Sequence, residues 1–191
     1  MRRFVVFSAK GRTRGDFKDL MKAGRLDIIA HSVIASLFLS HGIRKNVELH
    51  VILNGPPDPP KHIIFCYDEK IPISKKDVGE LLRATLWKYK KGKLVRAFPG
   101  VFIEKKSFEE VLEELSSYPI YLLDRKGKNF EEVKIGENPV FVLGDHEGLP
   151  KKQYKFAKKI CRERVSVGPF DYFTSQCIVV VNNFLDRKNI W

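Results

Sequence analysis

The sequence predicts an α/β protein built on one mostly parallel sheet. Several short segments are apolar at every position, which is typical of strands buried on both faces of a parallel sheet. Segments with an apolar period near 3.6 residues, typical of helices, lie between them. No repeat, low-complexity tract or flexible linker divides the 191 residues. We therefore expect a single domain over residues 1–191, with residues 70–115 as a possible insertion or extension.

The first half of the chain alternates between strand and helix patterns. The segment at 47–53 alternates apolar and polar residues like a half-buried strand, and Gly42 is a helix stop signal. The expected strands are 4–7, 47–53 and 62–67, and the expected helices are 27–42 and 77–91.

The second half keeps the same rhythm. Ser107 followed by Glu110 forms a capping box, which marks the start of a helix. The expected strands are 101–103, 119–123, 140–143 and 165–167, and the expected helices are 107–115, 150–163 and 174–188.

Three loops that follow predicted strands are candidates for the functional site, because ligands in such sheets bind beyond the carboxyl ends of strands. They are residues 124–128, 144–149 and 168–173. Gly144 and Gly168 come directly after strands and let the backbone approach a ligand. Neither loop carries the Gly-Lys-Ser/Thr of a P-loop or a GxGxxG fingerprint. A neutral or cationic nucleotide, read by backbone groups beside aromatic side chains, therefore fits better than a bare phosphate.

The chain is strongly basic, with 35 Lys and Arg against 23 Asp and Glu and a net charge of +12. The positive residues cluster in three segments, at 1–25, 88–96 and 151–164. Any one of these clusters, taken alone, can be explained as a solvent-exposed helix face, because lysines are common on protein surfaces. Three clusters with a large net excess favour a polyanionic partner, RNA or DNA, over a membrane surface.

Other function classes are disfavoured. Three cysteines without a CxxC pair argue against a disulfide framework and a thiolate zinc site. Asp145, His146 and Glu147 are adjacent in one tight loop without an HExxH motif, so we expect no metal. No apolar run reaches the roughly 18 residues of a membrane span, and the N-terminus is not a signal peptide. We expect a cytoplasmic protein that does not contact membranes.

The run Val-Leu-Gly-Asp-His-Glu-Gly-Leu-Pro at 142–150, followed by Val-Ser-Val-Gly-Pro at 165–169 and an apolar terminal helix, resembles the SPOUT methyltransferases. Within that class the whole chain is similar to the archaeal methyltransferases that act on N1 of pseudouridine 54 in the T loop of tRNA. The family that performs the same chemistry on small-subunit ribosomal RNA is the nearest alternative. The Asn-x-Gly-x-x-x-Arg motif of ribose 2′-O-methylating relatives is missing, which favours methylation of a base.

The resemblance implies a Rossmann-like sheet with a deep C-terminal trefoil knot, a homodimer, and S-adenosylmethionine bound by the knot loops. Cys177 alone would be interpreted as a small buried hydrophobe. With the resemblance it becomes a cofactor contact and a candidate catalytic residue, and an acidic neighbour such as Asp171 is compatible with a cationic donor. The cofactor-binding residues implied are Leu123, Gly144, Val167, Gly168, Pro169, Phe170, Asp171, Tyr172 and Cys177.

The chemistry implied is displacement of a methyl group from a sulfonium by N1 of pseudouridine, a weakly acidic imide nitrogen. It needs in-line placement of the reacting atoms and an acceptor for the N1 proton. The segment 54–60 holds four of the ten prolines. It is either a stiff connection between strands or a device that fixes Asp58 as proton acceptor or as a reader of the uracil edge.

Four arginines are candidates for phosphate contacts with the RNA: Arg2, Arg12, Arg14 and Arg25. Three functions stay open at this point. They are pseudouridine N1-methylation of tRNA, the same reaction on small-subunit ribosomal RNA, and RNA binding by an α/β module without catalysis.

Overall fold

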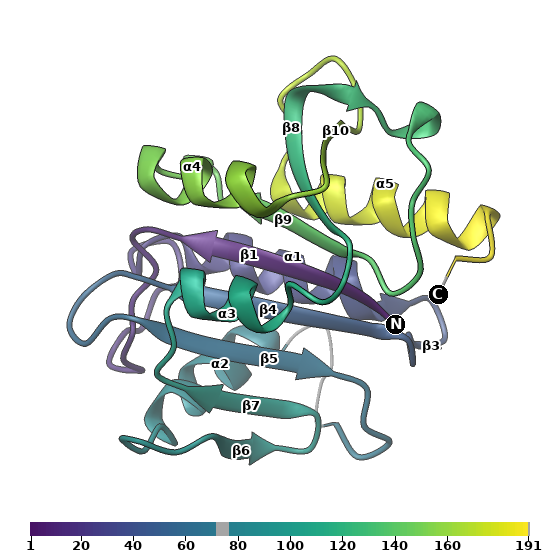
Figure 1. Ribbon diagram of the computed structural model, residues 1–191. Helices are drawn as coiled ribbons and strands as arrows, with labels where there is room; N and C mark the ends of the chain where they lie inside the picture. The colour runs from purple at the N-terminus through teal and green to yellow at the C-terminus, as the bar shows by residue number, and fades with distance from the viewer. Residues whose placement is uncertain (72–76, 191) are drawn as a thin grey trace.

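The computed structural model describes residues 1–71 and 77–190, which form an eight-stranded sheet with helices on both faces (Figure 1). The order across the sheet is β10-β8-β9-β1-β4-β5-β7-β6. Its strands are β1 (Arg2–Ser8), β4 (Val47–Leu53), β5 (Lys61–Cys66), β6 (Val95–Phe98), β7 (Val101–Glu104), β8 (Ile120–Asn129), β9 (Val140–Gly144) and β10 (Glu163–Ser166).

Most of the sheet is parallel. Strands β10, β8, β9, β1 and β4 pair in parallel, whereas β5, β7 and β6 are joined antiparallel at one edge. The antiparallel step from β4 to β5 follows from their short connection at 54–60, because a parallel pair needs a long crossover. The predicted mostly parallel α/β fold is confirmed. The segment 70–115, expected as an insertion or extension, contributes β6 and β7 to the edge of this same sheet.

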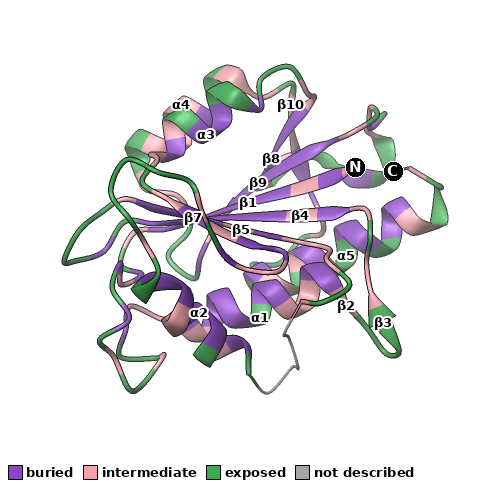
Figure 2. Cartoon of the chain, turned by 90° about the horizontal axis from the view of Figure 1, so that it is seen from below, coloured by how far each residue is buried: buried purple, intermediate pink, exposed green. Residues whose placement is uncertain are grey.

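Helices cover the two faces of the sheet (Figure 2). One face carries α1 (Leu26–Leu37), α2 (Val78–Trp87) and α5 (Thr174–Arg187), and the other carries α3 (Phe108–Glu114) and α4 (Lys151–Ile160). Strand β1 supplies both cores, with Phe4 and Val6 on the first face and Val5 and Phe7 on the second. Burial on both faces explains why this strand is apolar at every central position. No helix formed by the described residues has the length and apolar character needed to span a bilayer.

Three helices end three or more residues earlier than the sequence pattern predicts. The helix expected at 27–42 stops at Leu37, because the chain then forms the small hairpin β2 (Phe38–Leu39) and β3 (Gly42–Ile43). The helix expected at 77–91 stops at Trp87. The helix expected at 150–163 stops at Ile160, because Glu163 begins β10. After the first and third of these helices the chain enters a strand, whereas residues 88–91 after α2 form a loop and a turn.

The expected loop at 124–128 is part of the long strand β8, which ends in a single 3-10 turn, η1 (Phe130–Glu132). Its second half pairs with β10, with Lys128 opposite Val165. Gly127 permits this approach, because a Cβ there would lie 2.5 Å from the backbone nitrogen of Val165. Since the partner strand comes later in the chain, local pattern alone does not reveal the strand.

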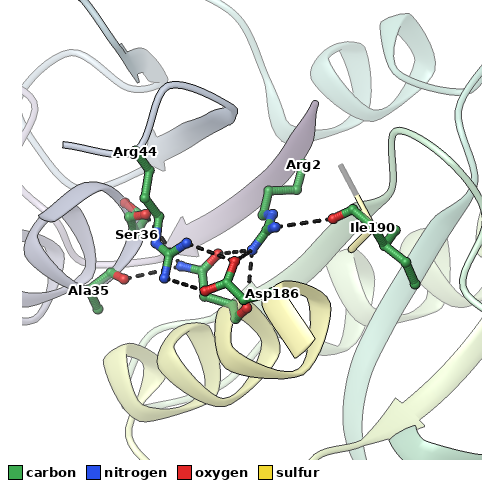
Figure 3. Close-up of polar contacts among 7 residues, drawn as sticks. Arg2, Ala35, Ser36, Arg44, Asp186 and Ile190 are labelled. Atoms are coloured by element: carbon green, nitrogen blue, oxygen red, sulfur yellow. Dashed lines mark hydrogen bonds and ion pairs between the residues drawn. The ribbon is translucent and has the colours of Figure 1, made fainter. Parts of the chain in front are cut away.

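Arg2 is a buried anchor between the first strand and the last helix (Figure 3). Its guanidinium donates hydrogen bonds to Asp186 Oδ1 at 2.9 Å, to the Asn182 carbonyl and side-chain oxygens at 3.1 Å, and to the Ile190 carbonyl at 3.1 Å. Arg44 donates to both Asp186 oxygens, at 2.9 and 2.7 Å. The expectation that Arg2 contacts RNA phosphates is wrong, because its side chain has no exposed surface.

Asn182 completes the same network, and this gives the residue a structural role that the sequence pattern does not suggest. Its side-chain amide donates to the carbonyl oxygens of Ala35 at 3.2 Å and Ser36 at 3.3 Å, near the end of α1 (Figure 3). These groups would otherwise be buried helix-end carbonyls without partners. The network therefore connects β1, α1 and α5, and it brings the two ends of the chain together.

Candidate functional site

A cavity of about 470 Å³ lies at the carboxyl ends of β9 and β10, beside β8 and the first turn of α5. Its volume is within the range of small-molecule sites, about 300–1,000 Å³. All three loops that the sequence singled out contribute to its wall. The lining residues are 123–125, 143–148, 165–168, 170–172, Thr174 and Cys177.

Eight of the nine residues expected to bind the cofactor line this cavity. They are Leu123, Gly144, Val167, Gly168, Phe170, Asp171, Tyr172 and Cys177. Pro169 is the exception, since it is not part of the wall. The sequence missed other members of the wall, above all Asp145 and Thr174. Both could have been found from their positions, because one follows the strand-terminal Gly144 and the other opens the last helix.

Glycines bring backbone, rather than side chains, to the cavity wall. A Cβ on Gly144 would lie 2.2 Å from the carbonyl carbon of Gly148, so these two turns of chain can touch only without a side chain. Gly168 has a φ of 154°, and a Cβ there would lie 2.7 Å from the Tyr172 hydroxyl oxygen. The wall therefore offers backbone NH and CO groups at close range, as expected for a ligand read by main-chain groups.

The N-terminus of α5 is joined to the loop after β9. Thr174 Oγ1 donates a hydrogen bond of 2.9 Å to the Gly144 carbonyl oxygen. This contact places Cys177, one turn further on, at the cavity. Burial raises the pKa of the Cys177 thiol to about 11. At neutral pH the side chain is a neutral thiol, so it forms part of the wall rather than acting as a thiolate.

Asp145 gives the cavity a buried negative group. Its side chain is 1% exposed, and Oδ1 accepts a hydrogen bond of 3.0 Å from the Glu147 backbone. Oδ2 is buried and accepts no hydrogen bond from any described residue. A buried acceptor without a partner is costly, so this oxygen suits a cationic or hydrogen-donating ligand. S-adenosylmethionine, a methyl donor that carries a positively charged sulfonium and an amino group, fits that requirement.

The rim beside β8 carries a second set of polar contacts. Asp124 Oδ2 accepts hydrogen bonds from the Tyr154 hydroxyl at 2.7 Å and from Arg164 at 3.1 Å. Burial alone would raise the pKa of Asp124, but these hydrogen bonds outweigh it and lower the pKa. Asp171, which was expected near the donor, is 80% exposed and forms an ion pair with Arg125 at 3.1 Å. Its charge is therefore directed to the rim.

Asp58 is not among the residues that line the cavity. Its carboxylate is half exposed and pairs with Lys105 and with the buried Lys61, the latter at 2.8 Å. Hydrogen bonds from these two lysines lower the pKa of Asp58 to about 2. The backbone NH of Asp58 donates to Thr13 Oγ1 at 2.9 Å, so the proline-rich loop is packed on the loop after β1.

The three remaining candidate arginines differ in how far their charge is compensated. Arg12 forms a two-point ion pair with Asp16, at 2.6 and 2.8 Å. Arg25 forms a similar pair with Asp27, at 3.0 Å for both contacts. Arg14 is exposed, lies over the Trp87 ring, and has no carboxylate partner among the described residues.

No three His, Cys, Asp or Glu side chains within 1–71 and 77–190 are grouped so that they could hold a metal ion. The groups that the cavity itself offers to a ligand are the glycine turns, the Asp145 carboxylate and the neutral Cys177 thiol.

Comparison with known proteins assigns the chain to a family. A family model described as "Putative SAM-dependent RNA methyltransferase" matches residues 1–190. The tRNA (pseudouridine(54)-N(1))-methyltransferase of Pyrococcus abyssi is 37% identical over 100% of both chains. The protein of the same name from Methanocaldococcus jannaschii is 33% identical over 100% of this chain and 98% of its own.

Among solved structures, Nep1 of Archaeoglobus fulgidus bound to S-adenosylhomocysteine superposes with a TM-score of 0.66 over 98% of both chains. At 14% identity this likeness concerns the fold alone. The family match, by contrast, spans nearly the whole sequence and agrees with the resemblance carried by residues 142–150 and 165–169. This chain belongs to the family of SAM-dependent RNA methyltransferases described by that model.

Proposed function

We propose that this protein transfers a methyl group from S-adenosylmethionine to N1 of pseudouridine 54 in tRNA. The observation that carries the proposal is the match, end to end and at 37% identity, to a tRNA (pseudouridine(54)-N(1))-methyltransferase. The cavity supports it independently, because it lies at the loops where a strand-end ligand is expected.

The glycine turns at Gly144 and Gly168 and the aromatic rings of Phe170 and Tyr172 are proposed to hold the cofactor, together with the other predicted lining residues. Asp145 adds a carboxylate oxygen that needs a donor. When bound, S-adenosylmethionine supplies an electrophilic methyl group. The chain's own contribution is to orient that group toward the RNA and to exclude water from the reacting atoms.

As the new N–C bond forms, the S–CH3 bond breaks and S-adenosylhomocysteine is released, while the proton on N1 passes to a base and finally to the solvent. A carboxylate whose pKa is about 2 is a weak base, so Asp58 is a poor acceptor for this proton. Of the two roles considered for Asp58, its half-exposed position favours hydrogen bonding to an N–H of the uracil edge. If Asp58→Ala kept full turnover on RNA, Asp58 would have neither role.

Cys177 is proposed as a cofactor contact in its neutral form. The raised pKa of about 11 removes the thiolate at physiological pH, so a covalent role for the sulfur is disfavoured. Arg12, Arg14 and Arg25 remain proposed phosphate contacts. Arg14 is the strongest of them because, among the described residues, no carboxylate forms an ion pair with it.

A homodimer is also part of the proposal. An apolar hollow lies between α1 and α5, and it is lined mainly by aliphatic and small side chains such as Ile34, Ala35, Val179 and Val180. Val179 is 52% exposed and Val180 39% exposed, which is unusual for aliphatic residues on a helix face. Tyr172 lines both this hollow and the cavity, so a second copy seated here would complete the site. The trefoil knot stays a prediction from the resemblance, and the cytoplasmic location stays a prediction from the composition of the sequence.

The test supplies wild-type protein and labelled S-adenosylmethionine with tRNA that carries either pseudouridine or uridine at position 54, and with small-subunit ribosomal RNA. We expect label only in the pseudouridine tRNA. Label in ribosomal RNA alone would favour the alternative substrate. Calorimetry with S-adenosylmethionine should release heat, and a chain that binds RNA without binding the cofactor would be a non-catalytic module.

A further inference from the structure

Trp87 is an exposed aromatic residue that does not line the cavity. It is the last residue of α2, and 53% of its surface is accessible. A tryptophan carries a large apolar ring, and exposing half of it to water is unfavourable unless a partner covers it.

The indole is held in place rather than free. Gly15 lies against its edge, since a Cβ on Gly15 would be 2.6 Å from the Trp87 Cδ1 atom and 2.4 Å from the Arg83 carbonyl oxygen. The Arg14 guanidinium carbon lies over the ring, 5.1 Å from its centroid. A cationic guanidinium thus lies over an aromatic ring at the surface, and both residues are exposed.

The charge around Trp87 is positive. Lys90, Lys91 and Lys93 follow it within six residues in the chain, and all three are exposed. Two further cations of the same segment are already engaged, since Lys88 donates to the Ala97 carbonyl oxygen and Arg96 pairs with Asp68. Part of the basic cluster at 88–96 therefore remains available to an anionic partner.

The loop after β1 links this surface to the cavity. At its start Lys10 forms an ion pair of 2.5 Å with Glu147, which lines the cavity. A few residues further, Arg14 and Gly15 contact Trp87. The aromatic surface and the cavity thus adjoin opposite parts of one loop, at the carboxyl-end edge of β1. A polynucleotide with one nucleotide at the cavity can continue along this loop.

We propose that Trp87 and Arg14 form a stacking platform for an unpaired RNA base outside the nucleotide that is methylated, with the lysines at 90–93 contacting the neighbouring phosphates. Aromatic rings and guanidinium planes stack with any base, and lysines beside them track the backbone. The inference rests on the proposed function in that the RNA is the methyl-transfer substrate.

The first test uses Trp87 as its own probe. The chain has two tryptophans, Trp87 and Trp191, so Trp191→Phe leaves Trp87 as the sole indole emitter. Titration with the pseudouridine tRNA should quench this emission, with the midpoint equal to the Kd from an independent filter-binding measurement. Full binding without any change in the Trp87 emission would overturn the platform.

The second test compares variants. Trp87→Ala should weaken tRNA binding by about 5-fold to 150-fold, the range for loss of one stacked base, and Trp87→Phe should recover most of that loss. Leu94→Ala is the matched control, because it removes a neighbouring side chain that is 56% exposed and not aromatic. It should change Kd by less than about twofold.

Salt dependence separates stacking from charge. Trp87→Ala should leave the slope of log K against log salt unchanged, whereas replacing Lys90, Lys91 and Lys93 by Gln should reduce it. Equal losses in Trp87→Ala and Leu94→Ala would overturn the platform. So would dissociation of an oligomer in Trp87→Ala, because the ring would then be a protein contact.

The outcomes also distinguish the platform from the proposed function. If the protein binds the tRNA with quenching of the Trp87 emission but transfers no methyl group, the proposed function is overturned and the platform is supported. If the wild-type protein transfers the methyl group and Trp87→Ala binds the tRNA with the wild-type Kd, the proposed function is supported and the platform is overturned. A wild-type chain that binds no RNA at all would overturn both.

Discussion

The Asp145 carboxylate illustrates how one buried oxygen constrains what a cavity can bind. Its Oδ2 atom has no hydrogen-bond donor among the described residues, so a ligand that brings positive charge relieves an unfavourable burial. S-adenosylmethionine and S-adenosylhomocysteine differ by the charged sulfonium. The two ligands therefore report separately on the charge and on the shape of the site.

Asp145→Asn keeps the size of the side chain and one acceptor oxygen but removes the charge. We expect its affinity for S-adenosylmethionine to fall by about tenfold, the difference between a charged and a neutral contact. Affinity for S-adenosylhomocysteine should fall less. Calorimetry with both ligands measures the two losses, and equal losses would show that the carboxylate does not sense the sulfonium.

Cys177 should react slowly with thiol reagents, because alkylation needs the thiolate and burial raises the thiol pKa from 9.0 to about 11. At pH 8 the thiolate fraction is then about a hundredfold below that of an ordinary cysteine. Peptide mapping after iodoacetamide treatment resolves Cys177 from Cys66 and Cys161. The Cys177 rate should keep rising above pH 9, and a plateau near pH 8 would contradict the raised pKa.

The cavity-lining residues that the sequence pointed to and the residues that it did not place differ in what surrounds them. Gly144 and Gly168 are recognisable because a glycine directly after a strand has a local meaning. Arg2 is not, since its partner Asp186 lies at the other end of the chain. From sequence alone a charged residue near a terminus is expected to be exposed, and only the folded structure shows the carboxylate that pairs with it. Asp145 was considered only as a metal ligand, and its unpaired oxygen is visible only in the folded loop.

At the scale of elements, β4, β5 and β7 share a buried chain of ionisable groups. His50 Nδ1 lies 3.0 Å from His62 Nε2, and His62 Nδ1 lies 2.9 Å from Glu104 Oε1. Burial lowers the pKa of His62 from 6.5 to about 4, although Glu104 opposes this. The hydrogen bond from His62 lowers the pKa of Glu104 to about 2. The charge states of His62 and Glu104 therefore depend on folding.

The sign of the resulting pH dependence follows from His62. Its folded pKa of about 4 is below the ordinary 6.5, so the unfolded chain binds more protons between these values. Stability from this group is present above pH 6.5 and is lost as the pH falls toward 4, by at most about 1.4 kcal/mol per pH unit. Urea unfolding of His62→Gln should show a flatter profile in that window. His41→Gln, at an exposed turn, is the control and should keep the wild-type slope.

The elements themselves were largely predictable, and the exceptions have a common cause. Strand β1 follows from its unbroken apolar run, and helices α4 and α5 follow from their apolar period, although α4 ends three residues before its predicted end. The second half of β8 is polar and becomes a strand only because β10 pairs with it at Lys128 and Asn129. Strand β6 pairs with β7 across a bulge at Arg96 and Phe98. Pairing decided by a distant partner leaves little local signal.

At the scale of the whole molecule, two kinds of surface border the cavity region. A basic and aromatic surface around Arg14 and Trp87 lies along the loop after β1, and an apolar hollow lies between α1 and α5. Tyr172 contributes to both the hollow and the cavity. RNA binding and dimer formation are therefore proposed to use different surfaces of the molecule, so mutations can test the two separately.

Val180→Glu should disrupt the proposed dimer, because it places a charge in the apolar hollow where an unpaired carboxylate is costly to bury. Sedimentation velocity should show wild-type protein as a dimer at micromolar concentration and the variant as a monomer. Leu94→Glu introduces the same charge at an exposed apolar residue outside the hollow, and it should remain dimeric. Because Tyr172 is shared, the monomer should also bind S-adenosylmethionine more weakly than the control. A Val180→Glu protein that stays dimeric would place the interface elsewhere, and a monomeric variant with wild-type cofactor affinity would show that the second copy does not complete the site.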